Sequence, residues 1–346
     1  MLDRLHAIRS FTAKAALGIV VASTVALAAC GTPTTSSGTG SNTPGASLCK
    51  VTAADITSSV STTGTATKVD DLSGQKLAID GSSALAPLFS SAKTSFDTVN
   101  GTQTTVTANG SGVGLKDVAA GAVQIGMSDV FASEKLTADQ AATLTDHQVG
   151  AVVFTLVTNS GLSGQVSDLT SAQVKQIFTG QVTNWSAVGG PNLPITLVTR
   201  PKSSGTRATF TKYVLGGTDE ATGQALTQET SGALLAAIKG TPGSIGYVSL
   251  SFVAANPNDV NPLCIDHAKA TAADVNVGKY NFWGIEHAYT KGPATGAAKA
   301  FLQFISSDAV QKNDLLKLNY LPLKSVAADA LQKHSVAGAP APESLS

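Results

Sequence analysis

The sequence predicts an α/β protein built of two lobes. Short runs rich in Val, Ile, Thr and aromatic residues alternate with segments in which apolar residues recur at helical spacing. Alternation of this kind is typical of α/β folds. The length of 346 residues suits two lobes better than a single sheet, and we find no internal repeat in the sequence.

The predicted strands and helices alternate along the folded part of the chain. Strand-like runs bounded by turn residues occupy 76–80, 151–159, 194–200 and 243–250. Helical patterns occupy 84–99, 170–180 and 231–240. Thr170 and Gln173 form a capping box before the second of these helices, and Gly180 supplies its end. The sequence therefore predicts mixed sheets flanked by helices.

The first 29 residues are typical of an export signal. Basic residues precede an apolar run over 15–29 that is short for a membrane span. The run ends in Leu-Ala-Ala-Cys and resembles a bacterial lipobox, in which Cys30 is lipid-modified and becomes the mature N-terminus. The alternative is an ordinary signal peptide cleaved at a small residue. We expect a lipoprotein signal peptide over 1–29 and a protein anchored by lipid to the outer face of the cytoplasmic membrane.

Both ends of the mature chain are predicted to be flexible. Residues 31–47 contain Gly, Ser, Thr, Pro, one Asn and one Ala, with no large apolar side chain, so they cannot offset the entropy lost on ordering. We expect residues 30–48 to form a tether that carries lipidated Cys30, and residues 336–346 to form a flexible tail.

Cys49 and Cys264 are expected to form a disulfide, because two leftover cysteines in an exported protein most simply pair. The alternative is two unrelated buried thiols. The bridge would span 215 positions (264 minus 49), so both cysteines are expected in one lobe.

The charge balance argues against a nucleic-acid surface. The chain has 23 Lys and Arg against 23 Asp and Glu, and removal of 1–29 takes away three basic groups and one acidic group, which leaves 20 against 22. Proteins that bind nucleic acid normally concentrate Lys and Arg to neutralise phosphates. Any anion site in this chain must therefore be local.

Four segments of small and hydroxyl residues each join a strand-like run to a helix-like run, at 79–89, 108–118, 125–134 and 199–210. In the last, a helix beginning at Ser204 leaves its first N–H groups unpaired and directs the positive end of its dipole at the same place. Gly205 permits close backbone approach, Thr206 adds a hydroxyl, and Arg200 can bind two oxygens of a tetrahedral anion. The pattern indicates a site for phosphate-like groups. The alternative is that Ser204 only caps the helix and the arginines are solvated.

The other three segments extend this pattern. Ser83 and Ser111 precede predicted helices, in turns without the spacing of a P-loop or a dinucleotide fingerprint. Asp129 would repel a fully ionised anion such as sulfate, but it could accept the proton that monohydrogen phosphate carries. It therefore indicates phosphate selectivity. The alternative is that Asp129 caps the following segment.

Five longer segments carry a resemblance to a known family. They are DGSSALAPLF, GSGVGLKDVAAGAVQIGMSD, LTSAQVKQIFTGQVTNWSAVGG, ITLVTRPKSSGTRATFTKYV and GSIGYVSL, in this order. Together they resemble the substrate-binding lipoproteins of bacterial phosphate ABC importers, from about Lys76 to about Leu323, and Arg-x-x-x-Ser-Gly-Thr is the most specific motif. The resemblance implies a two-lobed periplasmic-binding-protein fold of type II, with inorganic phosphate held in a cleft between the lobes without metal or other cofactor. It also implies permease and ATPase subunits as partners.

The resemblance also implies the ligands of the phosphate. They are Ser83 and the backbone N–H of Ala84, then Ser111 and Asp129, then Arg200, Ser204, Gly205 and Thr206. Asp129 falls 18 residues after Ser111 (129 minus 111), which is the spacing in the family. The chain departs from many members in having no acidic residue between the Arg and the Ser-Gly-Thr, where Pro201, Lys202 and Ser203 stand. Arg207 either contacts the ligand or holds Asp129.

The lobes are expected to close about a hinge, with strands near Thr158 and Gly246 as crossovers. This division assigns 49–158 and 246–335 to lobe 1, and 159–245 to lobe 2. We expect a monomer.

Three other functions remain open at this stage. An enzyme of phosphoryl transfer would need a metal or an activated nucleophile, and the five histidines at 6, 147, 267, 287 and 334 form no recognisable metal pair. A sulfate, molybdate or tungstate binder would have no use for a carboxylate at Asp129. A lipoprotein that signals phosphate status would share the same site.

Overall fold

A mixed β-sheet runs through the protein, shown here in a computed structural model that describes residues 50–221, 223 and 225–343. These residues belong to one compact unit, Ala46–Ser346. The strands are β1 (Lys76–Gly81), β2 (Gln103–Thr107), β3 (Ile125–Ser128), β4 (Leu144–Asn159), β5 (Asp168–Leu169), β6 (Thr196–Thr199), β7 (Leu226–Thr227), β8 (Ser244–Ser249), β9 (Val260–Ile265), β10 (Trp283–Lys291) and β11 (Tyr320–Leu321). The α-helices are α1 (Ala53–Ile56), α2 (Ala86–Asn100), α3 (Ser111–Ala120), α4 (Ala138–Ala141), α5 (Ser171–Phe178), α6 (Gly205–Tyr213), α7 (Ser231–Gly240), α8 (Leu250–Ala255), α9 (Ala272–Asn276), α10 (Gly296–Ser306), α11 (Leu315–Lys317) and α12 (Ala328–His334). The predicted signal peptide, the tether with Cys30, and Cys49 lie outside the described residues.

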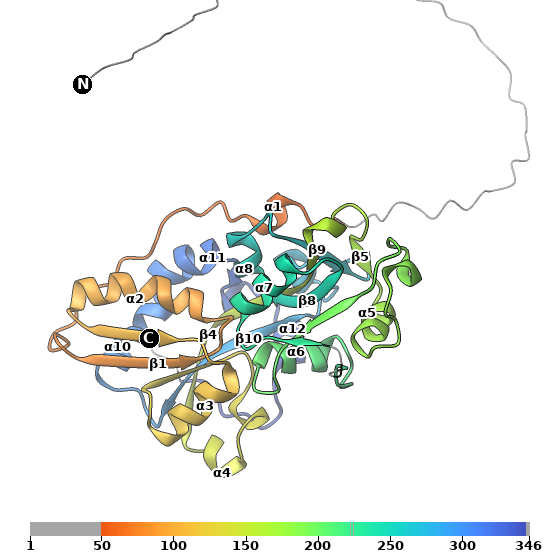
Figure 1. The fold of residues 1–346 in the computed structure, drawn as a ribbon. Coiled ribbons are helices and arrows are strands. Elements are labelled where there is room, and N and C mark those ends of the chain that lie inside the picture. The colour runs from red at the N-terminus through yellow and green to blue at the C-terminus, as the bar shows by residue number, and fades with distance from the viewer. Residues whose placement is uncertain (1–49, 222, 224, 344–346) are drawn as a thin grey trace, which may run out of the picture. The chain divides into compact units, whose positions relative to one another are not determined.

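The first part of the sheet has the strand order β2-β1-β3-β10-β4, and β11 pairs with β4. β1 is parallel to both β2 and β3, so α2 and α3 make the crossover connections between these strands. β10 is antiparallel to β3 and β4. Figure 1 shows α2, α3 and α10 around this part of the sheet.

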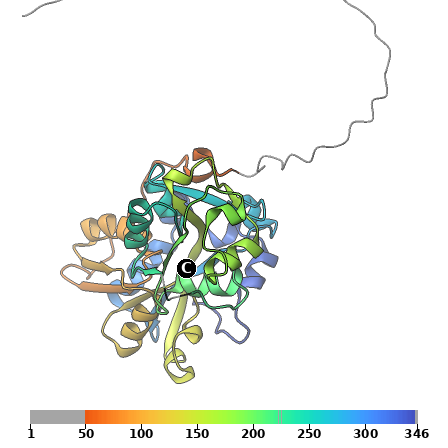
Figure 2. The same cartoon turned by 45° about the vertical axis from the view of Figure 1, so that its right-hand side comes forward.

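The second part of the sheet begins within β4. Up to Val153 this strand pairs with β10, whereas from Phe154 it pairs with β8 and from Leu156 also with β9. β6 and β7 extend the sheet in parallel beyond β8, and β5 pairs with β9. Helices α5, α6 and α7 accompany these strands (Figure 1), and Figure 2 shows the green segment that contains α5 and α6 well apart from the orange α2.

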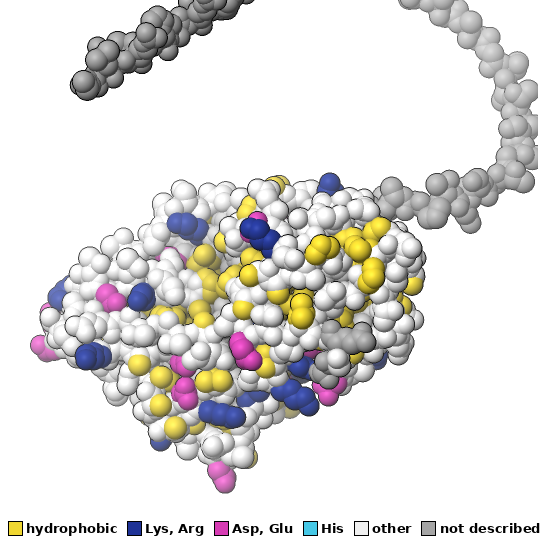
Figure 3. All heavy atoms as spheres, in the orientation of Figure 1, with side chains coloured by type: hydrophobic (Ala, Val, Ile, Leu, Met, Phe, Trp, Pro, Cys, Tyr) yellow, Lys and Arg dark blue, Asp and Glu magenta, His cyan; other side chains and the backbone are white. Residues whose placement is uncertain are grey.

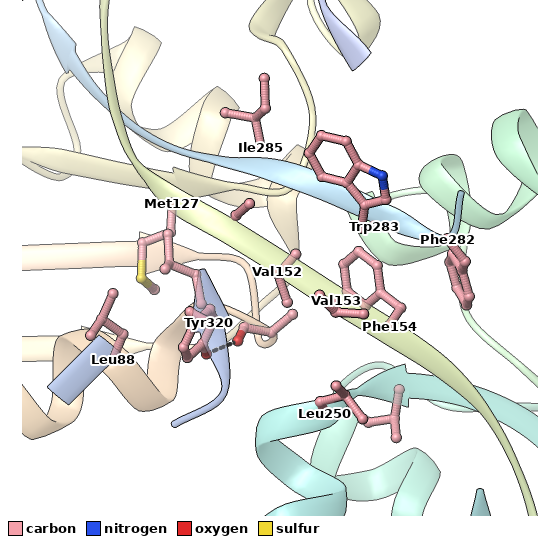
Figure 4. Close-up of a cluster of buried hydrophobic side chains, with 14 of the residues drawn as sticks. Leu88, Met127, Val152, Val153, Phe154, Leu250, Phe282, Trp283, Ile285 and Tyr320 are labelled. Atoms are coloured by element: carbon pink, nitrogen blue, oxygen red, sulfur yellow. Dashed lines mark hydrogen bonds between the residues drawn. The ribbon is translucent and has the colours of Figure 1, made fainter. Parts of the chain in front are cut away.

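β4 and β10 connect the two parts. The N–H of Phe154 donates to the carbonyl oxygen of Phe282 at 3.1 Å, immediately before β10 begins. Phe154, Phe282 and Trp283 are buried, and Figure 4 shows these side chains along the two strands. Burial of each phenylalanine ring contributes roughly 1.5–3 kcal/mol relative to exposure. Apolar packing therefore stabilises the connection made by β4 and β10 as well as the two parts of the sheet that it joins.

The strand pairing contradicts the predicted lobe boundaries. Residues 246–335 were assigned to lobe 1, yet β8 and β9 pair with the part of β4 that belongs to the second sheet. The chain returns to the first part at Phe282 and Trp283. Cys264 lies on β9 and thus in the second part. The boundary was misplaced because a strand's own sequence does not reveal its pairing partner. Movement of the two parts as lobes stays a prediction.

The C-terminal tail also differs from the prediction, as far as residue 343. Val336 and Ala339 are half-buried against the core, and the N–H of Glu343 donates to the carbonyl oxygen of Asp146 at 2.8 Å. The small apolar side chains of Val336 and Ala339 are sufficient to pack this segment against the core. Residues 336–343 are therefore part of the folded unit.

The predicted local signals are confirmed. The strand-like runs became β1, β4, β6 and β8, and the helical patterns became α2, α5 and α7. Thr170 and Gln173 form the reciprocal capping box of α5, and Gly180 follows that helix at φ 77°. Over the residues described, no helix has the length and apolar character required to span a bilayer.

Candidate functional site

The four predicted turns meet at one buried place between the two parts of the sheet. Ser83 follows β1, Ser111 starts α3, Asp129 follows β3, and Arg200 leads from β6 to α6. All eight predicted ligand residues are buried, including Ala84 and the start of α6, Ser204 to Thr206. The structure thus brings together residues that are separated by more than 100 positions in the sequence.

Asp129 lies among hydroxyl and amide groups. Its carboxylate accepts hydrogen bonds from the hydroxyl of Ser82 and from that of Thr206, the latter at 2.8 Å. Its N–H donates to the hydroxyl of Ser111 at 3.1 Å. These contacts exclude the alternative in which Asp129 is merely a helix cap.

The electrostatic surroundings make Asp129 a better proton acceptor than an ordinary carboxylate. Burial raises its pKa, and the hydroxyls of Ser82 and Thr206 together with the charges of Arg200 and Lys135 only partly oppose this. A carboxylate with a raised pKa binds a proton or a protonated ligand oxygen more strongly.

Arg200 is 1% exposed, so the alternative of a solvated arginine is wrong. Its Nη2 donates to the Ser83 hydroxyl at 3.2 Å and to the Glu229 carbonyl oxygen at 2.7 Å, and its Nη1 donates to the Ser231 hydroxyl at 3.4 Å. Its Nε has no hydrogen-bond partner among the described residues. A buried donor without an acceptor is costly, and an anion would satisfy it.

The start of α6 is capped by Ser204 and packs closely against α3. The Ser204 hydroxyl caps the helix by accepting from the Arg207 N–H at 3.2 Å, as the alternative held. Gly205 is packed so closely that a Cβ added there would lie 2.3 Å from the Ser111 hydroxyl oxygen. This glycine therefore permits the close approach of α6 to α3 that the site requires.

Arg207 does not hold Asp129, and its contact with the ligand stays a prediction. Its Nη1 donates to the carbonyl oxygen of Arg200 at 2.6 Å, and its Nε lies 3.1 Å from a carboxylate oxygen of Glu220. It therefore holds the main chain at Arg200 and pairs with Glu220, not with Asp129.

Lysines surround the outer side of the α6 turn. Lys135 Nζ donates to the carbonyl oxygens of Lys202 and Ser204, at 2.7 and 3.3 Å. A cavity of about 380 Å³ adjoins them, and its lining includes Lys135, Lys202, Arg207 and Lys212. On the face drawn in Figure 3, Lys and Arg side chains are interspersed with Asp and Glu.

Five participants were missed from the sequence. They are Ser82, Lys135, Glu220, Ser231 and Glu286. Ser231 starts α7, where its N–H donates to the Ser83 hydroxyl at 3.0 Å. Its position at a helix start next to Gly232 is the same signal that identified Ser111, and could have found it. Glu220 and Glu286 carry no such local signal.

No group of three or more His, Cys, Asp or Glu side chains suited to a metal ion occurs in the part of the chain that the structure describes. The donors at the site are hydroxyls, amides and a guanidinium, which suit an anion.

Glu286 is a buried carboxyl beside Asp129. It lies on β10 with no exposed surface, and its carboxyl group lies within hydrogen-bonding reach of the Asp129 carboxyl. The next residue along, His287, pairs across the strands with Ser128, which precedes Asp129. Burial and the Asp129 carboxyl raise the pKa of Glu286 well above its ordinary value.

Glu286→Gln is expected to stabilise the protein, increasingly so as the pH rises. A carboxyl whose pKa is raised by folding contributes stability below its unfolded pKa and loses it as the pH increases. We expect the midpoint of thermal unfolding to rise by about 2 °C for each kcal/mol gained in the free energy of unfolding. The difference in midpoint between the variant and the wild type should be larger at about pH 8 than at about pH 5. Asp139→Asn, which removes an exposed carboxylate, is the control. A difference between Glu286→Gln and wild type that is independent of pH would contradict this account.

Comparison with known proteins agrees with the fold. Residues 34–309 match the PBP superfamily domain. The chain is 42% identical over 271 residues to the phosphate-binding protein PstS of Bacillus subtilis, covering 78% of this chain and 88% of that one. A crystal structure from Clostridium perfringens, described as a phosphate ABC transporter substrate-binding protein with bound phosphate, is 27% identical with a TM-score of 0.64 and covers 72% of this chain and 99% of that one. An ABC-type phosphate transport receptor from Vibrio cholerae shares the fold, at 24% identity and a TM-score of 0.56 over 71% of this chain and 99% of that one. The predicted α/β, two-lobed fold class is confirmed, and the chain belongs to the PBP superfamily and, within it, to the family of the phosphate-binding protein PstS.

Proposed function

We propose that this protein is a receptor that binds inorganic phosphate and delivers it to the permease and ATPase subunits of an ABC importer. The names of its relatives support this function. The observation that carries it is a buried carboxylate, Asp129, placed among donors from three turns and beside Arg200. Such a site suits an oxyanion that still carries a proton.

In the proposed mechanism, the donors and the acceptor have separate roles. Arg200, the hydroxyls of Ser83, Ser111, Ser204 and Thr206, and the N–H groups of Ala84 and Gly205 bind the phosphate oxygens. Asp129 accepts the proton of monohydrogen phosphate in a charge-assisted hydrogen bond. Sulfate has no proton to offer at neutral pH, so its oxygen would face a carboxylate and be repelled. No metal and no covalent step is needed, so we do not assign an enzymatic activity.

Ligand trapping follows from contacts on both sides of the site. Ser83 and Asp129 belong to the first part of the sheet, whereas Arg200 and Thr206 belong to the second. Bound phosphate therefore favours the arrangement in which the two parts are close. We propose bending at Phe154 and Phe282 as the hinge.

Attachment to the membrane and the disulfide are further parts of the proposal. Cys30 would carry lipid at the outer face of the cytoplasmic membrane, and the protein would act as a monomer. Cys49 would pair with Cys264. In support of this pairing, the N-terminal helix α1 lies against α8, and Asp55 is 3.0 Å from Lys269, five positions after Cys264. The bridge would then fasten the N-terminal segment to the second part of the sheet.

Calorimetric titration with phosphate and with sulfate tests the function. We expect tight phosphate binding and no sulfate heat for the wild type, and for Asp129→Asn a phosphate affinity lower by about 10- to 100-fold with measurable sulfate binding. Asp329→Asn, at an exposed position, is the control. Equal binding of both anions by the wild type would contradict phosphate selectivity and would indicate a protein that binds oxyanions in general. Absence of heat from either anion would contradict the proposed function.

A further inference from the structure

The backbone that carries Arg200 is held by a chain of buried charged groups. The Arg207 guanidinium donates to the Arg200 carbonyl oxygen at 2.6 Å and pairs with Glu220 at 3.1 Å. Arg207 is 6% exposed and Glu220 is 4% exposed. A buried ion pair leaves a strongly destabilising charge when one partner is removed. Disruption of this pair would therefore act directly on the main chain at Arg200.

Among the described residues, Glu220 is also the buried acid nearest to the α6 turn in the sequence. The three residues between Arg200 and Ser204 include a lysine and no acid. Glu220 comes 20 positions after Arg200 (220 minus 200), beyond the end of α6, and returns to the buried side of that helix. It thus supplies a negative charge next to two buried arginines.

Tyr247 completes this group from β8. Its ring stacks on Phe210 of α6 with centroids 4.4 Å apart, and its hydroxyl faces the Glu220 carboxyl. The charged and titratable groups around Glu220 are therefore Arg207 on α6, Arg200 at the end of β6, Tyr247 on β8 and the neighbouring Asp219. Of the predicted phosphate ligands, Arg200 is the one whose charge shifts the pKa of Glu220.

We infer that Glu220 is a positioning residue for anion binding: it fixes Arg207, and through Arg207 the main chain that presents Arg200 to the ligand. This inference rests on the proposed function, because its effect is read through phosphate affinity. Glu220 itself does not contact the ligand.

The protonation of Glu220 falls in the neutral range. Burial raises its pKa to about 7, although the Tyr247 hydroxyl and the Arg207 charge lower it. Below this pH the carboxyl becomes neutral and the ion pair with Arg207 is lost. Positioning of Arg200 is therefore expected to be complete above neutral pH and weakened below it.

Phosphate titrations of Glu220→Gln across pH test the inference. Phosphate itself changes protonation in this range, so the ratio of the variant's Kd to the wild-type Kd is the quantity to follow. We expect a ratio of about 10 near pH 8 that falls toward about 1 near pH 6, where the wild type has also lost the charge. Asp329→Asn removes a negative charge at an exposed position outside this group and should leave the ratio near 1 throughout. Glu220→Asp should restore part of the affinity.

Tyr247→Phe provides a second test that keeps the ring stack. Because the hydroxyl lowers the pKa of Glu220, its removal should move the pH at which affinity declines upward. The inference is overturned if Glu220→Gln binds phosphate as tightly as wild type near pH 8, or, where that variant does not fold, if Tyr247→Phe leaves the pH profile unchanged. A wild type that binds no phosphate would instead contradict the proposed function.

Discussion

Gly205→Ala is expected to lower phosphate affinity by at least about 100-fold, because an added methyl group cannot be accommodated without moving α6 away from α3. The new Cβ would lie 2.3 Å from the Ser111 hydroxyl oxygen and 2.9 Å from the Asp129 Cβ. Both neighbours are buried, and both are proposed ligands. Displacement of Ser111 or Asp129 would move the proposed proton acceptor, Asp129, relative to the hydroxyl donors of the site.

Titration calorimetry with phosphate measures this loss, with Gly232→Ala as the matched control. Gly232 is also in the first turn of a helix, but a Cβ there would meet only Phe252, at 3.7 Å. We expect Gly232→Ala to bind like wild type. Wild-type affinity in a folded Gly205→Ala variant would show that the start of α6 does not contact the ligand.

Arg200→Lys is expected to lower phosphate affinity by about 100-fold despite retaining the positive charge. A guanidinium reaches the Ser83 and Ser231 hydroxyls and the Glu229 carbonyl oxygen while its Nε remains free for another acceptor. A lysine ammonium is a single nitrogen and cannot occupy these positions together. Buried hydroxyls would then lack a donor.

Comparison with Arg200→Gln separates charge from geometry. Both variants lose the guanidinium fork, and only the glutamine also loses the charge. We expect affinities in the order wild type, lysine, glutamine, with the first step the larger one. If the lysine variant matches the wild type, the charge alone is sufficient and the fork has no role.

Local signals in the sequence were sufficient to predict four strands, three helices and the turns of the site. Glycine, serine and threonine at strand-to-helix turns impose short-range geometry, so Ser83, Ser111 and Ser204 could be recognised without knowledge of the fold. Asp129 could be identified because a carboxylate is unexpected among anion donors.

Long-range pairing could not be predicted in the same way. The assignment of β8 and β9 to one part of the sheet depends on which strand they pair with. Both strands pair with β4, β8 along one edge and β9 along the other. Glu220 and Glu286 are ordinary acidic residues in sequence, and only burial beside a charged group makes them unusual. The residues alone indicated an oxyanion that carries a proton, and the resemblance to phosphate receptors identified that ligand as phosphate.

The hydrogen bonds that already join the two parts of the sheet lower the net free energy that any ligand gains on binding. Ser83 and Arg200 bind each other, and Thr206 binds Asp129, directly across the site. On the proposed function, an arriving anion must exchange these protein bonds for its own. An anion that can replace only some of them leaves buried groups unpaired, so discrimination depends on the bonds that are given up as well as on those that are formed.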